Sequence, residues 1–224
     1  METVVLRDIK DKEMELVLEA GTEKHMVLLS PENVTLRIRQ LQGSQLTLHA
    51  LMLSDANTHV NITVAQDEPG CSTHLYGLAL TKGTQTVDLE THVLHNTGGG
   101  TSTQLFKNVL DDSSHASFYG ELKVLPDAQK TEAFQTNRNI LLSPKAKMRT
   151  RPQLEIYADD VKCSHGATTG QLDSNALFYL QQRGIPLDEA RRLLLRAFFE
   201  DVILALKHSA IQEEIREQIN KRLS

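Results

Sequence analysis

The stretch Val60-Asn61-Ile62-Thr63-Val64 alternates apolar and polar residues, as does Val34-Thr35-Leu36-Arg37-Ile38 before it. A period of two is typical of a β-strand that buries one face. The pattern recurs between Lys24 and Val161, at Leu46/Leu48/Ala50, Tyr76/Leu78/Leu80, Val87/Leu89, Phe118/Gly120/Leu122/Val124 and Leu154/Ile156/Ala158. Turn-forming stretches such as Asp67-Glu68-Pro69-Gly70 separate these segments. We therefore expect many short strands with no helices between them.

Strands in such a series form a sandwich, a barrel or a β-solenoid. Tyr76-Gly77 and Tyr119-Gly120 are each followed by a similar strand pattern, as expected if two coils of a stacked structure had been traversed. An aromatic content of 4% with no tryptophan suits a narrow interior filled by aliphatic side chains. These features favour a solenoid, with a sandwich as the alternative.

Beyond residue 172 the apolar period becomes helical. Asp173 is placed to cap a helix over Ser174–Arg183, and Gly184 is suited to end it. A longer helix is expected over Pro186–His208, and its apolar residues cover more than one face. A last helix carries a stripe of Ile211, Ile215 and Ile219 that could dock on the strands or on a partner. The sequence thus predicts a β-domain over 1–172 and a small helical domain over 173–224.

Composition and charge exclude several classes of function. The formal net charge is -5, and no basic face suited to a nucleic-acid backbone stands out. No uncharged stretch approaches the roughly 18 residues of a membrane span. Cys71 and Cys163 lie far apart with no CxxC, which favours free thiols in a reducing compartment. We expect a cytoplasmic protein that binds neither nucleic acid nor membrane.

Motifs for catalysis are missing. His92 and His95 invite a metal interpretation, but residues three apart on a strand point to opposite faces. Gly98-Gly99-Gly100 has no following Gly-Lys-Ser/Thr, so we expect a flexible loop rather than a phosphate site. No serine-hydrolase elbow or His-Glu-x-x-His motif is present. The sequence predicts that the chain is not an enzyme.

Residues 158–168 form the one stretch dense in reactive groups. Cys163 and His165 are two positions apart, so on an extended segment they share a face, and a thiolate with an imidazole suits iron or zinc. Two ligands leave a metal site incomplete, so a partner would have to supply the others. The alternative is a buried cysteine beside a hydrogen-bonded histidine.

Several blocks of the C-terminal half resemble, in order, the SufB/SufD family of iron-sulfur cluster assembly proteins. The blocks are Ala128–Thr131, Gln135–Ser143, Pro152–Ile156, Asp159–Thr168 and Leu177–Ile185. Gly166 and Gln171-Leu172-Asp173 resemble the SufD branch. The resemblance is dense from His95 to Phe199, and the family's N-terminal helical region has no counterpart in this sequence.

The resemblance implies a right-handed parallel β-helix, a single-stranded solenoid, followed by a small helical domain. It also implies a scaffold that pairs with a SufB-like subunit through the β-helix and binds a SufC-like ABC ATPase through the helices. His165 matches the SufD histidine and lies beside Cys163, so the pair is expected to ligate iron or a nascent cluster at the SufB interface. No cofactor is expected to be tightly bound, and any iron or cluster would be transient and shared with SufB.

Three further points are left open. A purely structural heterodimerisation module would use Cys163 and His165 for packing, and a stand-alone metalloenzyme would hold stoichiometric metal. The isolated chain could also form a homodimer.

For the fold, we expect parallel coils in which six residues point into one shared interior: Leu36, Leu48, Ile62, Leu78, Leu122 and Ile156.

Overall fold

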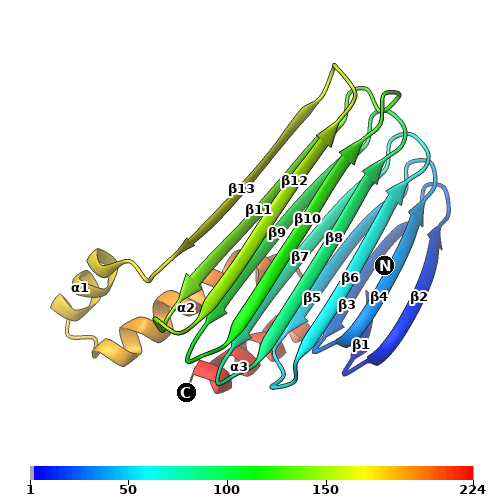
Figure 1. Cartoon of the computed structure of the whole chain (residues 1–224). Coiled ribbons are helices and arrows are strands. Elements are labelled where there is room, and N and C mark those ends of the chain that lie inside the picture. Colours follow the sequence, from blue (N-terminus) through cyan, green and yellow to red (C-terminus); the bar gives the residue numbers. More distant parts are fainter. Residues whose placement is uncertain (1–2, 224) are drawn as a thin grey trace.

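The computed structural model describes residues 3–223, which form two parallel β-sheets followed by helices (Figure 1). The seven-stranded sheet, here sheet A, contains β1 (Thr3–Arg7), β3 (Glu23–Leu29), β5 (Gln45–Met52), β7 (Ser72–Thr81), β9 (Thr101–Leu110), β11 (Glu132–Leu141) and β13 (Lys162–Gly170). The six-stranded sheet, sheet B, contains β2 (Lys10–Leu18), β4 (Glu32–Gln40), β6 (Thr58–Gln66), β8 (Thr86–His95), β10 (His115–Val124) and β12 (Lys147–Ile156). The helices are α1 (Ser174–Gln182), α2 (Leu187–Leu204) and α3 (Ser209–Leu223).

Successive strands alternate between the two sheets, so each coil of the chain adds one strand to each sheet. All strand pairs among the described residues are parallel, and Leu36 pairs with Ile62, which in turn pairs with Thr91. The fold is therefore a β-solenoid, which confirms the predicted parallel β-helix and excludes the sandwich of hairpins. The Tyr76 and Tyr119 repeat does not mark equivalent positions in two coils, so this interpretation was wrong. Tyr76 lies on β7 of sheet A, and Tyr119 lies on β10 of sheet B.

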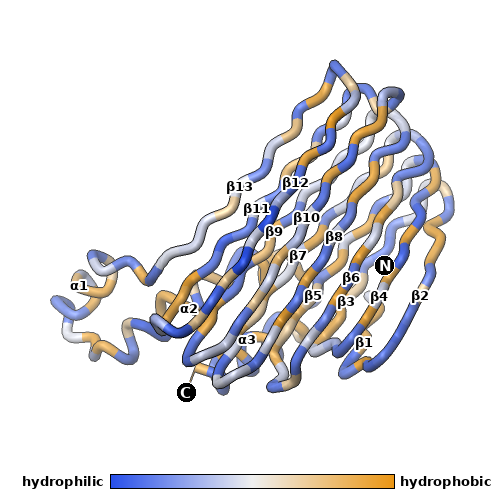
Figure 2. The backbone as a smooth tube through the Cα atoms, in the orientation of Figure 1, coloured by the Kyte–Doolittle hydropathy of each residue, from blue (hydrophilic) through white to orange (hydrophobic). Residues whose placement is uncertain are grey.

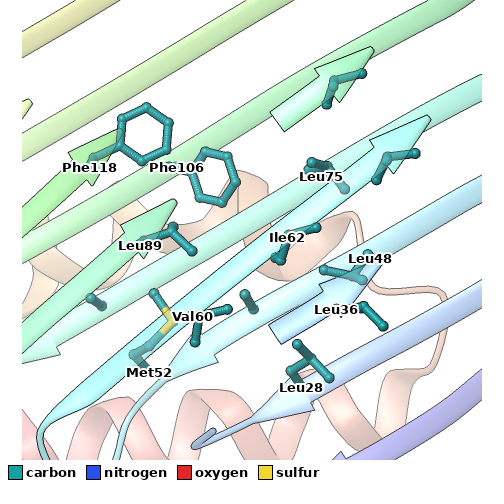
Figure 3. Close-up of a cluster of buried hydrophobic side chains, with 14 of the residues drawn as sticks. Leu28, Leu36, Leu48, Met52, Val60, Ile62, Leu75, Leu89, Phe106 and Phe118 are labelled. Carbon is teal, nitrogen blue, oxygen red and sulfur yellow. The ribbon is translucent and has the colours of Figure 1, made fainter. Parts of the chain in front are cut away.

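The interior between the two sheets is filled by stacked apolar side chains, and Figure 3 shows part of this core. The hydrophobic alternation that produces it runs along the strands in Figure 2. Leu36, Leu48, Ile62 and Leu122 lie in this interior, as predicted.

Two of the six predicted interior residues lie elsewhere. Leu78 is buried on the outer face of sheet A, in a cluster with the helices. Alternation could not reveal this, because both faces of β7 are apolar. Ile156 has 40% of its surface exposed, since it ends β12, the last strand of sheet B, and no later coil within residues 3–223 covers it.

Helices α2 and α3 cover the outer face of sheet A. Phe199, Ile215 and Ile219 are at most 1% exposed, and they share a cluster with Leu51 and Leu78 of the sheet. The isoleucine stripe of α3 therefore docks on the strands. The extra apolar coverage of α2 is explained by its contacts with the sheet and with both other helices.

Helix α1 differs from the others because it has no buried residue, and it extends away from the sheets (Figure 1). Asp173 caps it by accepting a 2.8 Å hydrogen bond from the backbone N of Asn175, and Gly184 follows it with φ 82°, both as predicted. The boundary predicted at residue 172 lies between the end of β13 and the start of α1. The division into two domains stays a prediction.

Candidate functional site

Strand β13 is the last strand of sheet A in the part of the chain that the structure describes, and it pairs only with β11. Every residue of β13 except Cys163 is exposed. Strand β12 is likewise the last strand of sheet B. Two strand edges therefore meet at one end of the stack, here called the open end (Figure 1). Cys163 and His165 both lie there, on β13.

Cys163 and His165 occupy successive positions on the same face of β13. Cys163 pairs in register with Ala133, and His165 pairs with Gln135. Cys163 is half-buried and packs against the interior cluster and against a small cluster with Ala128. His165 is exposed, because β13 is the last strand that the structure describes in sheet A and nothing is stacked on its far edge within residues 3–223.

Burial raises the pKa of the Cys163 thiol, and a hydrogen bond with the backbone of Ala133 only partly opposes this. The thiol is therefore protonated at neutral pH, unlike the activated cysteines of enzymes. A metal ion would have to displace the proton, as is usual when a thiolate ligates. The pair can supply one sulfur and one nitrogen ligand to a soft or borderline metal.

The two carboxylates before β13 do not complete a metal site. Asp160 lies in the turn from β12 to β13, where its backbone N donates to Gln129 Oε1 and its O accepts from Lys130 N, at 2.9 and 2.6 Å. No group of three His, Cys, Asp or Glu side chains between Thr3 and Leu223 is arranged to hold a metal ion. The open end thus brings together two of the predicted ligands and no third.

The other histidine pair has structural roles. His92 Nδ1 lies 2.9 Å from Glu121 Oε2 on the outer face of sheet B. His95 points inward, where its Nε2 lies 2.8 Å from Ser102 Oγ and burial lowers its pKa to about 4. The two side chains lie on opposite faces of β8, as predicted.

The glycine run is not a flexible loop but part of a stack of turns. Gly99 N donates to Gln129 O at 2.9 Å, and Gly98 O accepts from Gly70 N at 3.3 Å. A Cβ on Gly98 would lie 2.8 Å from Gln129 O, so glycine is required for the turns to approach this closely. The expectation of a flexible loop was wrong because neighbouring coils hold this turn.

Sequence reasoning missed a polar interior near the open end. The rings of Phe106 and Phe118 pack 5.0 Å apart between the sheets (Figure 3). One strand further on in each sheet, Asn137 is in register with Phe106, and Thr150 is in register with Phe118. Asn137 Nδ2 and Thr150 Oγ1 are buried without a partner in the described chain. Both polar residues stand at strand positions that point inward, and this feature of the sequence could have revealed the polar interior.

Helix α1 provides a second candidate surface. Phe178 is 62% exposed and Tyr179 is 56% exposed, although both are large apolar side chains. The guanidinium of Arg183 lies 4.7 Å from the centre of the Tyr179 ring. Exposed aromatic side chains grouped beside a cation are typical of protein-binding surfaces.

The comparisons with known proteins bear on both surfaces. Residues 26–198 match the family model described as "SUF system FeS cluster assembly, SufBD core domain". The chain belongs to the SufB/SufD family. It is 35% identical over 175 residues to the iron-sulfur cluster assembly protein SufD of Escherichia coli, covering 78% of this chain and 41% of the relative.

Two further relatives extend this match. The chain is 35% identical to the SufBD family protein slr0076 of Synechocystis, over 84% of this chain and 42% of the relative. It is 34% identical to the chloroplastic protein ABCI7 of Arabidopsis thaliana, over 98% of this chain and 45% of the relative. The chain therefore spans less than half the length of these SufB/SufD relatives. The resemblance to SufD in the first relative places it in the SufD branch.

Proposed function

We propose that this chain is a SufD-like scaffold subunit, and not an enzyme, in a complex that assembles iron-sulfur clusters. The observation that carries the proposal is the open end, where the β-strands of a SufBD core end in an exposed strand that bears an incomplete pair of metal ligands. A SufB-like subunit would pair with the β-helix and contribute the missing ligands. Iron or a nascent cluster would be held transiently as cargo rather than as a resident cofactor.

The arrangement of the edge strands supports pairing at this end. Exposed N–H and C=O groups along β12 and β13 are ready to pair with strands of another chain. Lys162 and Glu132 flank the start of this edge, with Nζ 2.7 Å from Oε1, so the rim is polar and the ligand pair lies inside it. A polar rim around partly apolar positions is typical of interfaces between subunits.

The helical region would bind a SufC-like ABC ATPase, which would supply the nucleotide chemistry. Helices α2 and α3 are largely occupied by sheet A, whereas α1 has no buried residue and exposes two aromatic side chains. Phe178 and Tyr179 are therefore the proposed anchors for the ATPase. None of the helices within residues 3–223 is both long and apolar enough to cross a membrane.

A purely structural heterodimerisation module is the competing function, and the half-buried, packed Cys163 favours it for that residue. The experiment that separates the alternatives begins with co-expression. Tagged chain should capture SufB-like and SufC-like subunits of the same organism, and the purified complex should support reconstitution of a cluster on an apo-protein. Failure to capture either subunit would overturn the scaffold proposal. Stoichiometric metal in the isolated chain would indicate the stand-alone metalloenzyme instead.

A further inference from the structure

The outer face of strand β12 carries a row of cations beside the open end. Met148 and Leu154 pack against the interior, so the residues that alternate with them point outward. Three of these outward residues are basic and exposed, and they are called the basic row here: Lys147, Arg149 and Arg151. Because β12 is the last strand of sheet B in the described chain, the basic row lies along a free strand edge. A strand added there by a partner would lie directly beside these cations.

The basic row has no ion-pair partner, although other cations on the outer face of sheet B do. Arg39 Nε lies 2.7 Å from Asp67 Oδ2, and Lys123 Nζ lies 3.2 Å from Glu155 Oε2. Within residues 3–223, no side chain of the basic row forms an ion pair with a carboxylate. The positive charge of the row is therefore uncompensated.

The neighbouring strand β10 explains why the row is unpaired. In register with its three cations, β10 carries His115, Ser117 and Tyr119, none of which is acidic. The guanidinium of Arg151 lies 5.7 Å from the centre of the Tyr119 ring, a contact that orients the cation without cancelling its charge. Asp88 lies one strand further away, where it accepts a hydrogen bond from the Ser117 hydroxyl. Compensation would have to come from the other side, across the free edge.

We propose that the basic row selects a partner strand that carries carboxylates at alternate positions and belongs to the SufB-like subunit. Side chains directly opposite each other on paired strands lie about 5 Å apart, so each carboxylate would meet one cation. Unpaired cations on an edge also oppose the addition of strands that lack carboxylates. The inference rests on the proposed function, because it names the chemistry by which β12 takes its partner subunit.

A second copy of this chain, paired at the same end, lacks the matching charges. The one acidic residue of β12 is Glu155, which is already bonded to Lys123, and β13 has no acidic residue. In such a pair at least two cations of each row would therefore face neutral or basic side chains. Charge complementarity favours a different subunit over a second copy.

Head-to-tail stacking of copies does not supply the charges either. The other end of sheet B begins with β2, which carries the acidic residues Asp11, Glu13 and Glu15. Sheet A has seven strands and sheet B has six, so β13 extends one strand beyond β12 at the open end. If β13 met β1 of the next copy, β2 of that copy would lie one strand away from the basic row. The step at the open end suits a partner that adds a strand to β12.

Calorimetric titration of the purified SufB-like subunit into the full chain tests the proposal. The double change Arg149→Glu and Arg151→Glu turns two attractions into repulsions, so it should weaken binding about thirtyfold. The double change to glutamine removes the attractions alone and should weaken binding about three- to tenfold. Neither variant should melt earlier, because these side chains have no ion pair to lose within residues 3–223. Unchanged affinity of the glutamate variant would overturn the inference and leave the scaffold proposal standing.

The double change Lys12→Glu and Lys221→Glu is the matched control, because it alters the net charge by the same amount. Both lysines are exposed, one on β2 at the opposite end of sheet B and one in the last turn of α3. This control should bind like the native chain. An equal loss of affinity in the control would show an effect of net charge and would overturn the inference.

Salt dependence and self-association provide two further readouts. Raising the salt concentration from about 0.1 M to about 1 M shortens the screening length from about 10 Å to about 3 Å, so it should weaken binding of the native chain more than binding of the glutamine variant. Equal salt dependence of the two would contradict the proposal. Sedimentation of the isolated chain tests the second copy. A dimer or stack that the Arg149→Glu and Arg151→Glu variant loses would show that the row binds another copy, and this too would overturn the inference.

Discussion

Lys107 on β9 is 4% exposed, and its Nζ lies 2.6 Å from the carboxylate of Asp201 and 2.6 Å from Phe198 O, both on α2. The ammonium also lies 4.9 Å from the centre of the Phe198 ring. A charge buried this deeply is tolerated only with such partners. This contact joins α2 to sheet A.

Lys107→Met should therefore lower the free energy of unfolding by about 1–3 kcal/mol, because methionine fills the space but leaves the Phe198 carbonyl without its donor. Denaturant unfolding of the whole chain measures this loss. The matched control is Lys162→Met, which removes a 2.7 Å ion pair to Glu132 whose lysine side chain is 75% exposed. That change should cost much less, because solvent screens an exposed ion pair. Equal losses would show that burial of Lys107 is not what makes its ion pair strong.

His165→Ala should abolish cluster maturation while leaving the melting temperature and complex assembly unchanged. The physical reason is that His165 is exposed on the edge strand, so its removal opens no cavity and leaves no buried group unpaired. The measurements are cluster-dependent enzyme activity in cells and thermal unfolding of the purified complex. A variant that melts earlier but still matures clusters would show a packing role and contradict the ligand role.

The double change Phe178→Ser and Tyr179→Ser should weaken binding of the ATPase at least tenfold, a loss typical of interface anchors. Titration of the purified ATPase by calorimetry measures the effect. Because both side chains are more than half exposed, thermal stability should not change. Tyr157→Ser is the matched control, since Tyr157 is 57% exposed but lies next to β12 rather than on α1. Undiminished binding by the double variant would exclude α1 as the docking surface.

Stability should fall between about pH 6.5 and pH 4, in part because of His95. Burial lowers the pKa of His95 from 6.5 to about 4, so the unfolded chain binds a proton that the folded chain excludes. The stabilisation is complete above pH 6.5 and is lost as the pH falls toward 4, by on the order of 3 kcal/mol. Denaturant unfolding at pH 7 and pH 5 measures it.

His95→Gln should flatten this pH dependence, because glutamine can still bond to Ser102 but does not titrate in this range. His59→Gln is the control, since His59 on β6 is exposed to solvent in the folded chain, whereas His95 is buried. If both variants retain the same slope as the native chain, then His95 does not carry the effect.

Period-two alternation predicted the strands of β4 and β6 well, because a strand that buries one face must alternate. It failed at Leu78, since β7 has one face against the interior and the other against α2. It also failed at Ile156, since burial there depends on whether another coil follows. The repeat of Tyr76 and Tyr119 wrongly predicted equivalent positions in two coils, because strands of both sheets share the same local pattern.

The candidate site was predicted in part. The spacing of Cys163 and His165 predicted a shared face, and the structure places both on the inner side of β13. Spacing alone did not predict that Gln135 lies directly beside His165. That neighbour comes from the previous coil, and the number of residues in the intervening turns sets its register.

By itself, the sequence determined the family, the parallel β-helix expected from that resemblance, and the helical end with its cap at Asp173. The tertiary structure alone decided which face of sheet A the helices cover, where the stack ends, and which buried amide lies next to His165. The physical reason is that alternation and capping are local properties of the backbone. Coil register and the cover over a strand depend on contacts between residues far apart in the chain.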